Sequence, residues 1–148
     1  MPPLLLSALL FCFLLAPNGR SAIAATAQVP SYTAVLADGP ARKTPVMEFD
    51  CHQDVYVFFT WYGLSGLHQI TALWYNPGEK QESQIDLKFI AAEGKTENWV
   101  ALKLLDLKRE KNPVLPSLAS SKFIGKWETR IYLDGNFLEK KNFEVRCD

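Results

Sequence analysis

Residues 125–135 read GKWETRIYLDG, and this stretch decides the fold. Trp127, Thr129, Ile131 and Leu133 alternate with the charged residues Lys126, Glu128 and Arg130, a period of two that is typical of a strand with one buried face. Asp134-Gly135 then supplies the dipeptide of a tight hairpin turn. Phe143 and Val145 repeat the alternation just before the chain ends. The sequence therefore predicts an antiparallel hairpin at its C-terminal end.

Further strand-like stretches lie upstream of this hairpin. Residues 54–62 are apolar on both parities, as expected for a central strand that is buried on both faces. Residues 108–121 are charged and then rich in proline, which predicts a long crossing loop. The fold class that fits is an all-β, seven-stranded, antiparallel two-sheet sandwich. Its seven strands are expected at residues 46–49, 54–62, 67–75, 85–89, 99–107, 123–133 and 143–147.

Three short motifs give the chain a family resemblance. Gly125-Lys126-Trp127 opens the penultimate strand, Asp134-Gly135 makes the turn, and Phe143-Glu144-Val145 closes the sheet. This pattern resembles the closing hairpin of immunoglobulin-like and fibronectin type III-like domains of exported bacterial proteins. Residues 68–78, which end in WYNPG, are similar to the third strand of such domains. The resemblance covers residues 44–148 and implies a core position for Trp74, but it implies little about function because sandwiches have many roles.

The N-terminal region is typical of an export signal. The apolar run at residues 4–16 is too short to span a bilayer, which takes about 20 residues, and it contains Cys12. We interpret residues 1–27 as a signal peptide that is cleaved after Ala24 or Ala27. Residues 28–43 are expected to form a tether or a loosely docked first strand, and 44–148 the folded domain. The mature chain is then periplasmic or extracellular and has no membrane span.

Two cysteines, Cys51 and Cys147, remain after the signal is removed. An even number of cysteines in an exported chain favours one disulfide, which here would join the start of the domain to its end. Two free thiols are the alternative. Antibody-type domains join two core strands instead, so this bridge would set the chain apart from them. No Cys-x-x-Cys motif supports redox catalysis.

Charge and motifs exclude several classes of function. The chain has 16 basic and 16 acidic residues, so it lacks the electrostatic footprint of a nucleic-acid-binding protein or of a protein that binds anionic membranes. No glycine-rich phosphate loop and no Gly-x-Ser-x-Gly nucleophile motif is present, and no pair of carboxylates stands out for glycoside hydrolysis. The sequence predicts no cofactor.

The two histidines, His52 and His68, are the remaining candidates for chemistry. Ser65 lies near His68 in the sequence, but a structural histidine at the rim of a sheet is the interpretation we favour. In an extended segment, Asp50, His52 and Asp54 would share one face and could begin a metal site. Zinc requires three or four convergent ligands, so a solvated loop is favoured over a metal site.

Aromatic residues are numerous for a chain of this length. Adjacent pairs such as Trp61-Tyr62 and Trp74-Tyr75 point to opposite faces of a sheet, so one ring of each pair can reach the surface. Exposed rings of this kind can stack on sugars or bind a partner, although core packing is the interpretation we favour. The candidate binding aromatics are Trp61, Tyr62, Trp74, Tyr75 and Trp99, with Tyr132 as a further surface candidate.

These observations lead to three hypotheses about function. The first is an exported, non-enzymatic binding or accessory module whose partner is another exported protein or a glycan. The second is a carbohydrate-binding module that uses surface aromatics such as Tyr75 and Trp99. The third is a small periplasmic metal-binding protein that uses His52 and His68.

Overall fold

A computed structural model describes residues 31–41, 44–104 and 120–147 of the chain. The expected signal peptide, its cleavage sites and most of the expected crossing loop lie outside the described residues. The described residues form eight strands and one short 3₁₀ helix. These are β1 (Ser31–Ala37), β2 (Glu48–Asp50), β3 (Asp54–Tyr62), β4 (Gly66–Tyr75), β5 (Gln81–Ala91), β6 (Lys95–Lys103), η1 (Ser120–Phe123), β7 (Gly125–Leu133) and β8 (Asn136–Arg146).

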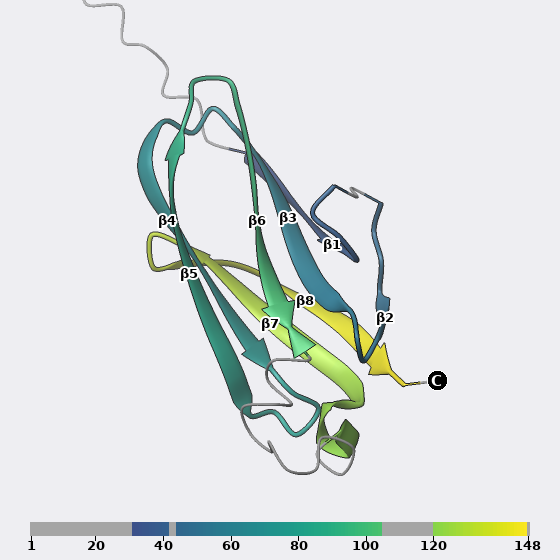
Figure 1. The fold of residues 1–148 in the computed structure, drawn as a ribbon. Helices are drawn as coiled ribbons and strands as arrows, with labels where there is room; N and C mark the ends of the chain where they lie inside the picture. Colours follow the sequence, from purple (N-terminus) through teal and green to yellow (C-terminus); the bar gives the residue numbers. More distant parts are fainter. Residues whose placement is uncertain (1–30, 42–43, 105–119, 148) are drawn as a thin grey trace, which may run out of the picture.

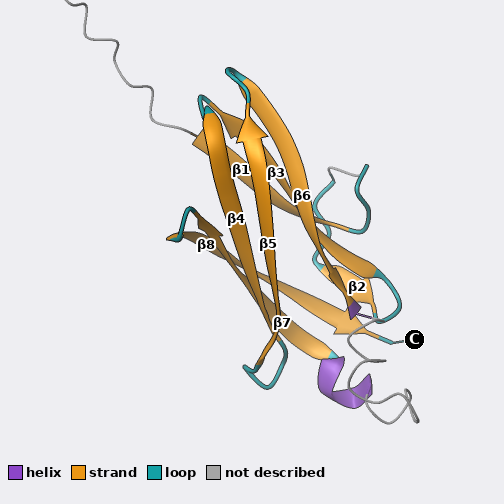
Figure 2. Cartoon of the chain, turned by 60° about the vertical axis from the view of Figure 1, so that its left-hand side comes forward, coloured by secondary structure: helices purple, strands orange, loops and turns teal. Residues whose placement is uncertain are grey.

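The strands form two sheets that pack face to face (Figures 1 and 2). One sheet has the order β1-β3-β6, and the other has the order β2-β8-β7-β4-β5. Immunoglobulin-type sandwiches place strands A, B and E in one sheet and strands C, F and G in the other. In this chain β1, β3 and β6 correspond to the first set, and β4, β7 and β8 to the second. The predicted all-β, two-sheet architecture is confirmed.

The prediction of seven strands is wrong, because the described residues contain eight. The additional strand, β1, lies inside the segment 28–43 that was expected to be a tether or a loosely docked first strand. It pairs along its whole length with β3, and Tyr32, Ala34 and Leu36 lie opposite Trp61, Phe59 and Val57. This alternation turns one side of β1 toward the core, where Leu36 is 2% exposed. Burial of that side fixes β1 to the sandwich.

The expectation of a purely antiparallel sandwich is also wrong, because β2 runs parallel to β8. The register places Glu48, Phe49 and Asp50 beside Glu144, Val145 and Arg146. Cys51 and Cys147 follow directly on the two strands, and the backbone N–H of Cys51 donates to the carbonyl of Arg146 at 2.7 Å. The disulfide therefore continues the parallel ladder by one more pair. Figure 1 shows β2 beside the end of β8, close to the C-terminus.

Aromatic side chains fill the space between the two sheets at both ends. At one end the ring of Trp61 stacks on those of Phe59 and Phe89, with centroids 5.5 and 5.8 Å apart. At the other end Phe143 contacts both Trp74 and Trp127 at 6.0 Å. Trp61, Trp74 and Trp127 are each 2% exposed or less, so three of the four tryptophans form the core. The core position that the resemblance implied for Trp74 is confirmed.

The predicted hairpin between β7 and β8 is present, and two of its residues have the backbone that such a turn needs. Asp134 and Gly135 have φ values of 50° and 79°, and Leu133 pairs with Asn136. Positive φ at both central positions defines the type I′ turn whose twist suits a hairpin. Gly125, which opens β7, has φ of 122°, and a Cβ there would lie 3.3 Å from Pro77. A glycine is therefore required at the start of the Gly-x-Trp motif.

Candidate functional site

The two sides of the sandwich differ in how their sheet edges are protected. On one side the chain crosses from β1 to β2, and the backbone N–H of Val46 donates to Leu36 at 2.9 Å. On the other side the turn at 92–94 carries the chain from β5, the last strand of one sheet, to β6, the last strand of the other. Figure 2 shows this turn at the top of the molecule, with β5 and β6 leading away from it. Among the described strands, β6 pairs only with β3, so its outer edge is unpaired.

A groove with a volume of about 740 Å³ follows this edge of β6. The β6 residues that line it, Glu97 to Ala101, are consecutive, and Lys103 follows them. Successive side chains of a strand point to opposite faces, so a consecutive run means that the groove lies along the backbone edge itself. The other lining residues are Pro40, Phe58, Ile85, Asp86 and Leu87.

Trp99 is the most prominent side chain at the groove. It points outward from the three-stranded sheet opposite Phe58 and is 45% exposed. Its ring packs edge-on against Tyr56, with centroids 5.3 Å apart. Phe58 also belongs to the outer face, yet it is only 8% exposed. Phe58 and Trp99 together give the groove an apolar wall beside the strand edge.

Asn98 places a polar group at the groove. Its Oδ1 accepts a hydrogen bond from the indole Nε1 of Trp61 at 3.1 Å, which fixes the orientation of the amide. Its Nδ2 is buried and has no hydrogen-bond partner among the described residues. A buried donor without a partner is costly, so a ligand that brings an acceptor to Nδ2 gains from it. Sequence reasoning missed Asn98, because it lies among the polar residues that precede the apolar run beginning at Trp99.

Two acidic side chains, Asp86 and Glu97, border the groove. Asp86 accepts hydrogen bonds from Thr71, Gln84 and Gln69, and these bonds lower the pKa of its carboxyl group. Glu97 pairs with Lys95 at 2.6 Å. Lys103 adds a positive charge at the other end of β6, so the two ends of the groove differ in charge.

The candidate binding aromatics do not gather on one surface. Trp61 and Trp74 are buried in the core, whereas Tyr62 and Trp99 are 42% and 45% exposed. Tyr62 and Trp99 both face outward from the three-stranded sheet. Trp99 pairs with Phe58, which lies four residues before Tyr62 along β3. Tyr75 and Tyr132 are half-buried. As expected, each adjacent pair sends one ring inward and the other outward.

Tyr75 belongs to a second hollow, of about 580 Å³, on the outer face of the five-stranded sheet. The guanidinium of Arg130 lies 4.3 Å from the centre of its ring. Glu128 forms ion pairs with Arg130 at 2.6 Å and with Lys140 at 3.2 Å. These contacts, chiefly the hydrogen bond from Arg130, lower the pKa of Glu128. The charges of this hollow thus largely neutralise one another, and Arg130 covers one face of the tyrosine.

The structure does not bring the two histidines together. His52 precedes β3 and His68 follows it, so the nine-residue strand separates them by about 30 Å. His68 has partners at both ring nitrogens: Nδ1 lies 2.7 Å from Asp134, and Nε2 lies 3.0 Å from the carbonyl oxygen of Ser65. The hydrogen bond to Asp134 raises the pKa of His68. His68 therefore serves to fasten the start of β4 to the β7–β8 turn.

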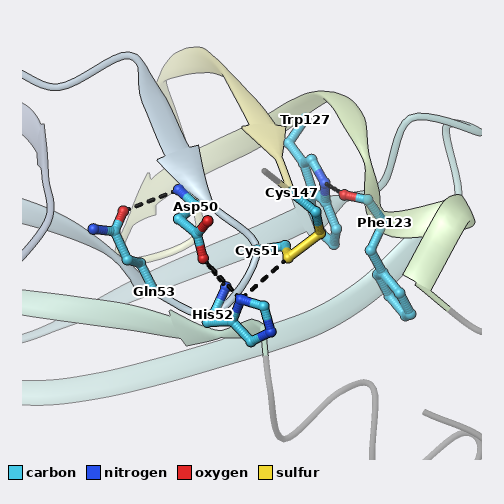
Figure 3. The surroundings of a disulfide bond; sticks show 7 residues. All are labelled: Asp50, Cys51, His52, Gln53, Phe123, Trp127 and Cys147. Carbon is cyan, nitrogen blue, oxygen red and sulfur yellow. Dashed lines mark hydrogen bonds and ion pairs between the residues drawn. A yellow bond between two sulfur atoms is a disulfide. The ribbon is translucent and has the colours of Figure 1, made fainter. Parts of the chain in front are cut away.

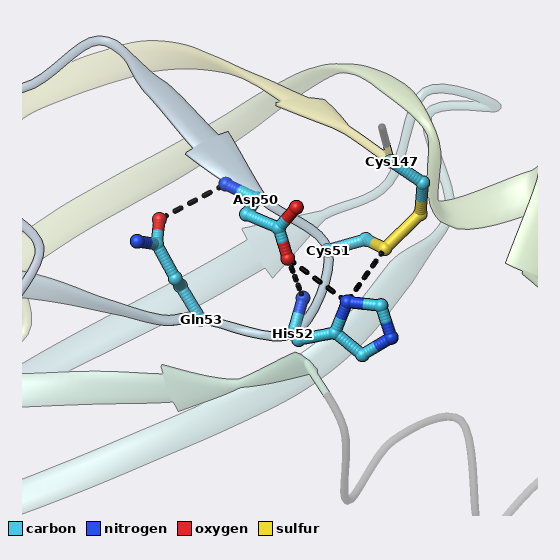
Figure 4. A network of polar contacts seen from close by, with 5 residues as sticks. All are labelled: Asp50, Cys51, His52, Gln53 and Cys147. Atoms are coloured by element: carbon cyan, nitrogen blue, oxygen red, sulfur yellow. Dashed lines mark hydrogen bonds and ion pairs between the residues drawn. A yellow bond between two sulfur atoms is a disulfide. The ribbon is translucent and has the colours of Figure 1, made fainter.

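His52 lies beside the disulfide (Figures 3 and 4). Its Nδ1 is 2.9 Å from Asp50 Oδ1 and 3.5 Å from Cys51 Sγ. Asp50, Cys51 and His52 thus offer three potential metal-ligand atoms within 4.8 Å of one another. The sulfur of Cys51 is bonded to that of Cys147, so only two of these atoms can act as ligands. Two ligands fall short of the three or four that zinc requires.

The predicted disulfide between Cys51 and Cys147 is present, with Cα atoms 5.2 Å apart. Figure 3 shows it near Trp127, whose indole N–H donates to the carbonyl of Phe123 at 2.8 Å. Cys51 is 1% exposed, whereas Cys147 lies at the surface. Within the described part of the chain, no helix has the length and apolar character needed to cross a membrane.

No known protein family and no curated protein matches the sequence. Many solved structures are similar in shape, including the following three. An immunoglobulin-like protein from Pseudomonas aeruginosa has 12% identity and a TM-score of 0.48, and the match covers 82% of this chain and 99% of that protein. A β-glucosidase from Listeria innocua has 9% identity and a TM-score of 0.47, over 79% of this chain and 16% of the enzyme.

The third is an alkylpurine DNA glycosylase from Pseudomonas fluorescens, with 10% identity and a TM-score of 0.48, over 80% of this chain and 30% of that protein. This chain therefore spans less than a third of either enzyme. At these identities and TM-scores, the similarities carry no argument about activity.

Proposed function

We propose that this chain is an exported, non-enzymatic accessory module of immunoglobulin-like or fibronectin type III-like type. Its role is to bind an extended segment of a protein partner in the groove along β6. The observation that supports this proposal is the consecutive lining of the groove by Glu97 to Ala101, which puts the unpaired backbone edge of β6 inside it.

An unpaired strand edge binds extended polypeptides by strand addition. Alternate residues of the edge present N–H and C=O groups that pair with a new strand, and side pockets select its side chains. Here Trp99 and Phe58 offer an apolar wall, and Asn98 offers a buried donor without a partner among the described residues. Strand addition at β6 would extend the three-stranded sheet by one strand.

Export is supported by the disulfide. Disulfides persist in oxidising compartments and are rare in the cytosol. The apolar run at residues 4–16 is typical of a signal peptide, which agrees with this interpretation. Both ring nitrogens of His68 are engaged, one by Asp134 and the other by the carbonyl oxygen of Ser65, which favours a structural role over catalysis for this residue.

A displayed library of random peptides, panned against the purified mature chain, tests the proposal. We expect enriched peptides of alternating apolar character whose binding is weakened about tenfold or more by Trp99→Ala, because a central exposed aromatic residue dominates binding energy. Ala101→Lys places a charge beside the strand edge and should block pairing. Phe137→Ala is the matched control, since Phe137 is 55% exposed on β8, in the other sheet.

Two results would contradict the proposal. One is peptide binding that Ala101→Lys leaves unchanged. The other is reproducible hydrolase turnover by the purified mature chain in a broad substrate screen, provided that it survives in a second, independent preparation.

A carbohydrate-binding module is the second candidate, favoured by the outward exposure of Tyr62 and Trp99 on one face. Aromatic rings that face solvent offer the flat apolar surfaces on which sugars stack. A glycan array separates the two candidates. Glycan binding that is lost on Trp99→Ala and Tyr62→Ala, but kept on Ala101→Lys, would support the sugar platform over strand addition.

A further inference from the structure

We infer that the strand received by the β6 groove is β6 of a second copy of this chain, paired antiparallel about a twofold axis through Val100. The inference rests on the proposed function of this edge as a polypeptide-binding surface, and it names the partner. Its basis is the order of charged, large and small side chains along β6. In this register, the side chains of one copy of β6 complement those of the other copy in charge and in size.

The charges of β6 match across such an axis. With Val100 opposite Val100, Glu97 lies three residues before the axis and faces Lys103, three residues after it, in the second copy. Glu97 and Lys103 both line the groove and belong to the same face of β6 as Trp99. The twofold axis makes this opposite-charge pair twice. Opposite charges directly across an antiparallel ladder are stabilising, and like charges are destabilising.

Side-chain size matches in the same register. Trp99 faces Ala101 of the second copy, and Ala101 of the first faces Trp99 of the second. The exposed indole thus lies beside a small side chain, which leaves room for it on the outer face of the joined sheet. Trp99, which is 45% exposed in the isolated chain, would be covered by this contact.

Neighbouring registers lack this complementarity. An axis through Trp99 would place Lys95 opposite Lys103, and an axis through Asn98 would place Glu97 opposite Trp99. Only the axis through Val100 sets Glu97 against Lys103. Charged residues on an edge strand ordinarily discourage pairing, but in this register the same residues favour it.

The product is a closed dimer. Its joined sheet has the order β1-β3-β6-β6-β3-β1, and the axis makes the interface isologous, with the same residues on both sides. Each β6 edge covers the other, so this contact cannot propagate into a fibre.

Sedimentation velocity in low salt, followed over a concentration series, tests the inference. We expect the unmodified chain to dimerise. Glu97→Lys alone and Lys103→Glu alone should each raise the dimer Kd about tenfold or more, because each sets like charges opposite one another twice. The double variant E97K/K103E restores opposite charges in the same register and should recover the dimer.

Glu79→Lys and Lys80→Glu are matched controls, since both residues are exposed in the β4–β5 turn and their reversals change the net charge equally. Circular dichroism and thermal unfolding of every variant establish that it is folded. A chain that stays monomeric up to about 1 mM would overturn the inference. So would a dimer that is indifferent to the single reversals or that the double variant fails to restore.

The two proposals fail in different ways. If the unmodified chain is monomeric while library peptides still bind in a manner that depends on Ala101→Lys, the second copy is the wrong partner and strand addition stands. If neither association is found, the groove does not bind polypeptide strands.

Discussion

His68 is held by acceptors at both of its ring nitrogens. Asp134 receives one N–H and the carbonyl of Ser65 receives the other, an arrangement that suits the protonated ring. The pKa of His68 is raised, chiefly by Asp134, and the pKa of Asp134 is lowered, chiefly by His68. One residue pair thereby makes the attachment of the β7–β8 turn sensitive to pH.

We predict that this pair stabilises the fold most between about pH 4 and 6.5. Because the pKa of His68 is raised in the folded protein, the ring contributes its full stabilisation at pH values below the pKa of the unfolded chain. This stabilisation is lost as the pH rises through the pKa of the folded protein. Because the pKa of Asp134 is lowered in the folded protein, the stabilisation that its carboxylate contributes is lost as the pH falls through the pKa of the folded protein. Urea unfolding across pH measures the effect. In His68→Gln the loss of stability above about pH 6.5 should disappear, and an unchanged profile would show that the pair is unimportant.

The hydroxyl group of Thr129 lies in the core and makes no hydrogen bond with the described residues. The residue is fully buried. We predict that Thr129→Val raises the free energy of unfolding by about 1 kcal/mol, because it removes a desolvated hydroxyl. Thr71→Val is the control. Its hydroxyl donates to Asp86 and lies nearer the surface, so this change should lower stability. Urea unfolding of both variants gives the comparison.

At the scale of the strands, alternation and turn residues were sufficient to find most elements. The runs expected at residues 54–62 and 67–75 agree with β3 and β4 to within one residue. The run expected at 99–107 was placed too late, because β6 begins at Lys95 among polar residues whose strand character comes from pairing with β3. Pattern therefore located the strands better than it located their ends.

The parallel pairing of β2 and β8 could have been found from the cysteines. Each cysteine follows directly on a strand, and a disulfide between them draws the ends of both strands toward one point. Two strands that arrive side by side at the same point run in the same direction. The sequence carried this information only when the disulfide and the strands were considered together.

We predict that C51A/C147A lowers the free energy of unfolding by as much as about 4–5 kcal/mol, because the bridge closes a loop of 96 residues. Urea unfolding of the oxidised chain and of the double variant measures the difference. The chain should expose no titratable thiol from this pair before reduction. Equal stability, or two thiols that react freely in the oxidised protein, would contradict the role of the bridge as the clamp of this ladder.

The candidate site was harder to predict than the fold. Trp99 was singled out, but Trp61 was not separated from it, because β3 is apolar at both odd and even positions and sheet faces are set by partners far away in sequence. Asn98 matters only because β6 lies at an edge, and edges follow from the pairing of all eight strands. A site made by an unpaired edge therefore becomes visible only in the assembled sandwich.

For the whole molecule, we predict that one tryptophan accounts for nearly all the fluorescence that iodide can quench. Trp61, Trp74 and Trp127 are buried, whereas Trp99 is 45% exposed. Trp99→Phe should leave emission that iodide barely quenches, and Trp74→Phe should leave the quenchable fraction intact. Strong quenching that survives Trp99→Phe would mean that the core is not packed as described. In the proposed dimer, quenching of Trp99 should also fall as protein concentration rises.

The covalent link between Cys51 and Cys147 also decides how the sandwich would respond to mechanical tension. Force applied between Ser31 and Cys147 passes along the backbone of β1 and β2 to Cys51 and then crosses the disulfide, so the backbone of residues 52–146 lies outside the covalent load path. Only the stretch from residue 31 to residue 50 can extend, by at most about 70 Å. Reduction of the disulfide would place the remaining strands in the load path and lengthen the maximum extension several-fold. Under tension, the oxidised domain therefore behaves as a short tether, and reduction makes additional chain length available.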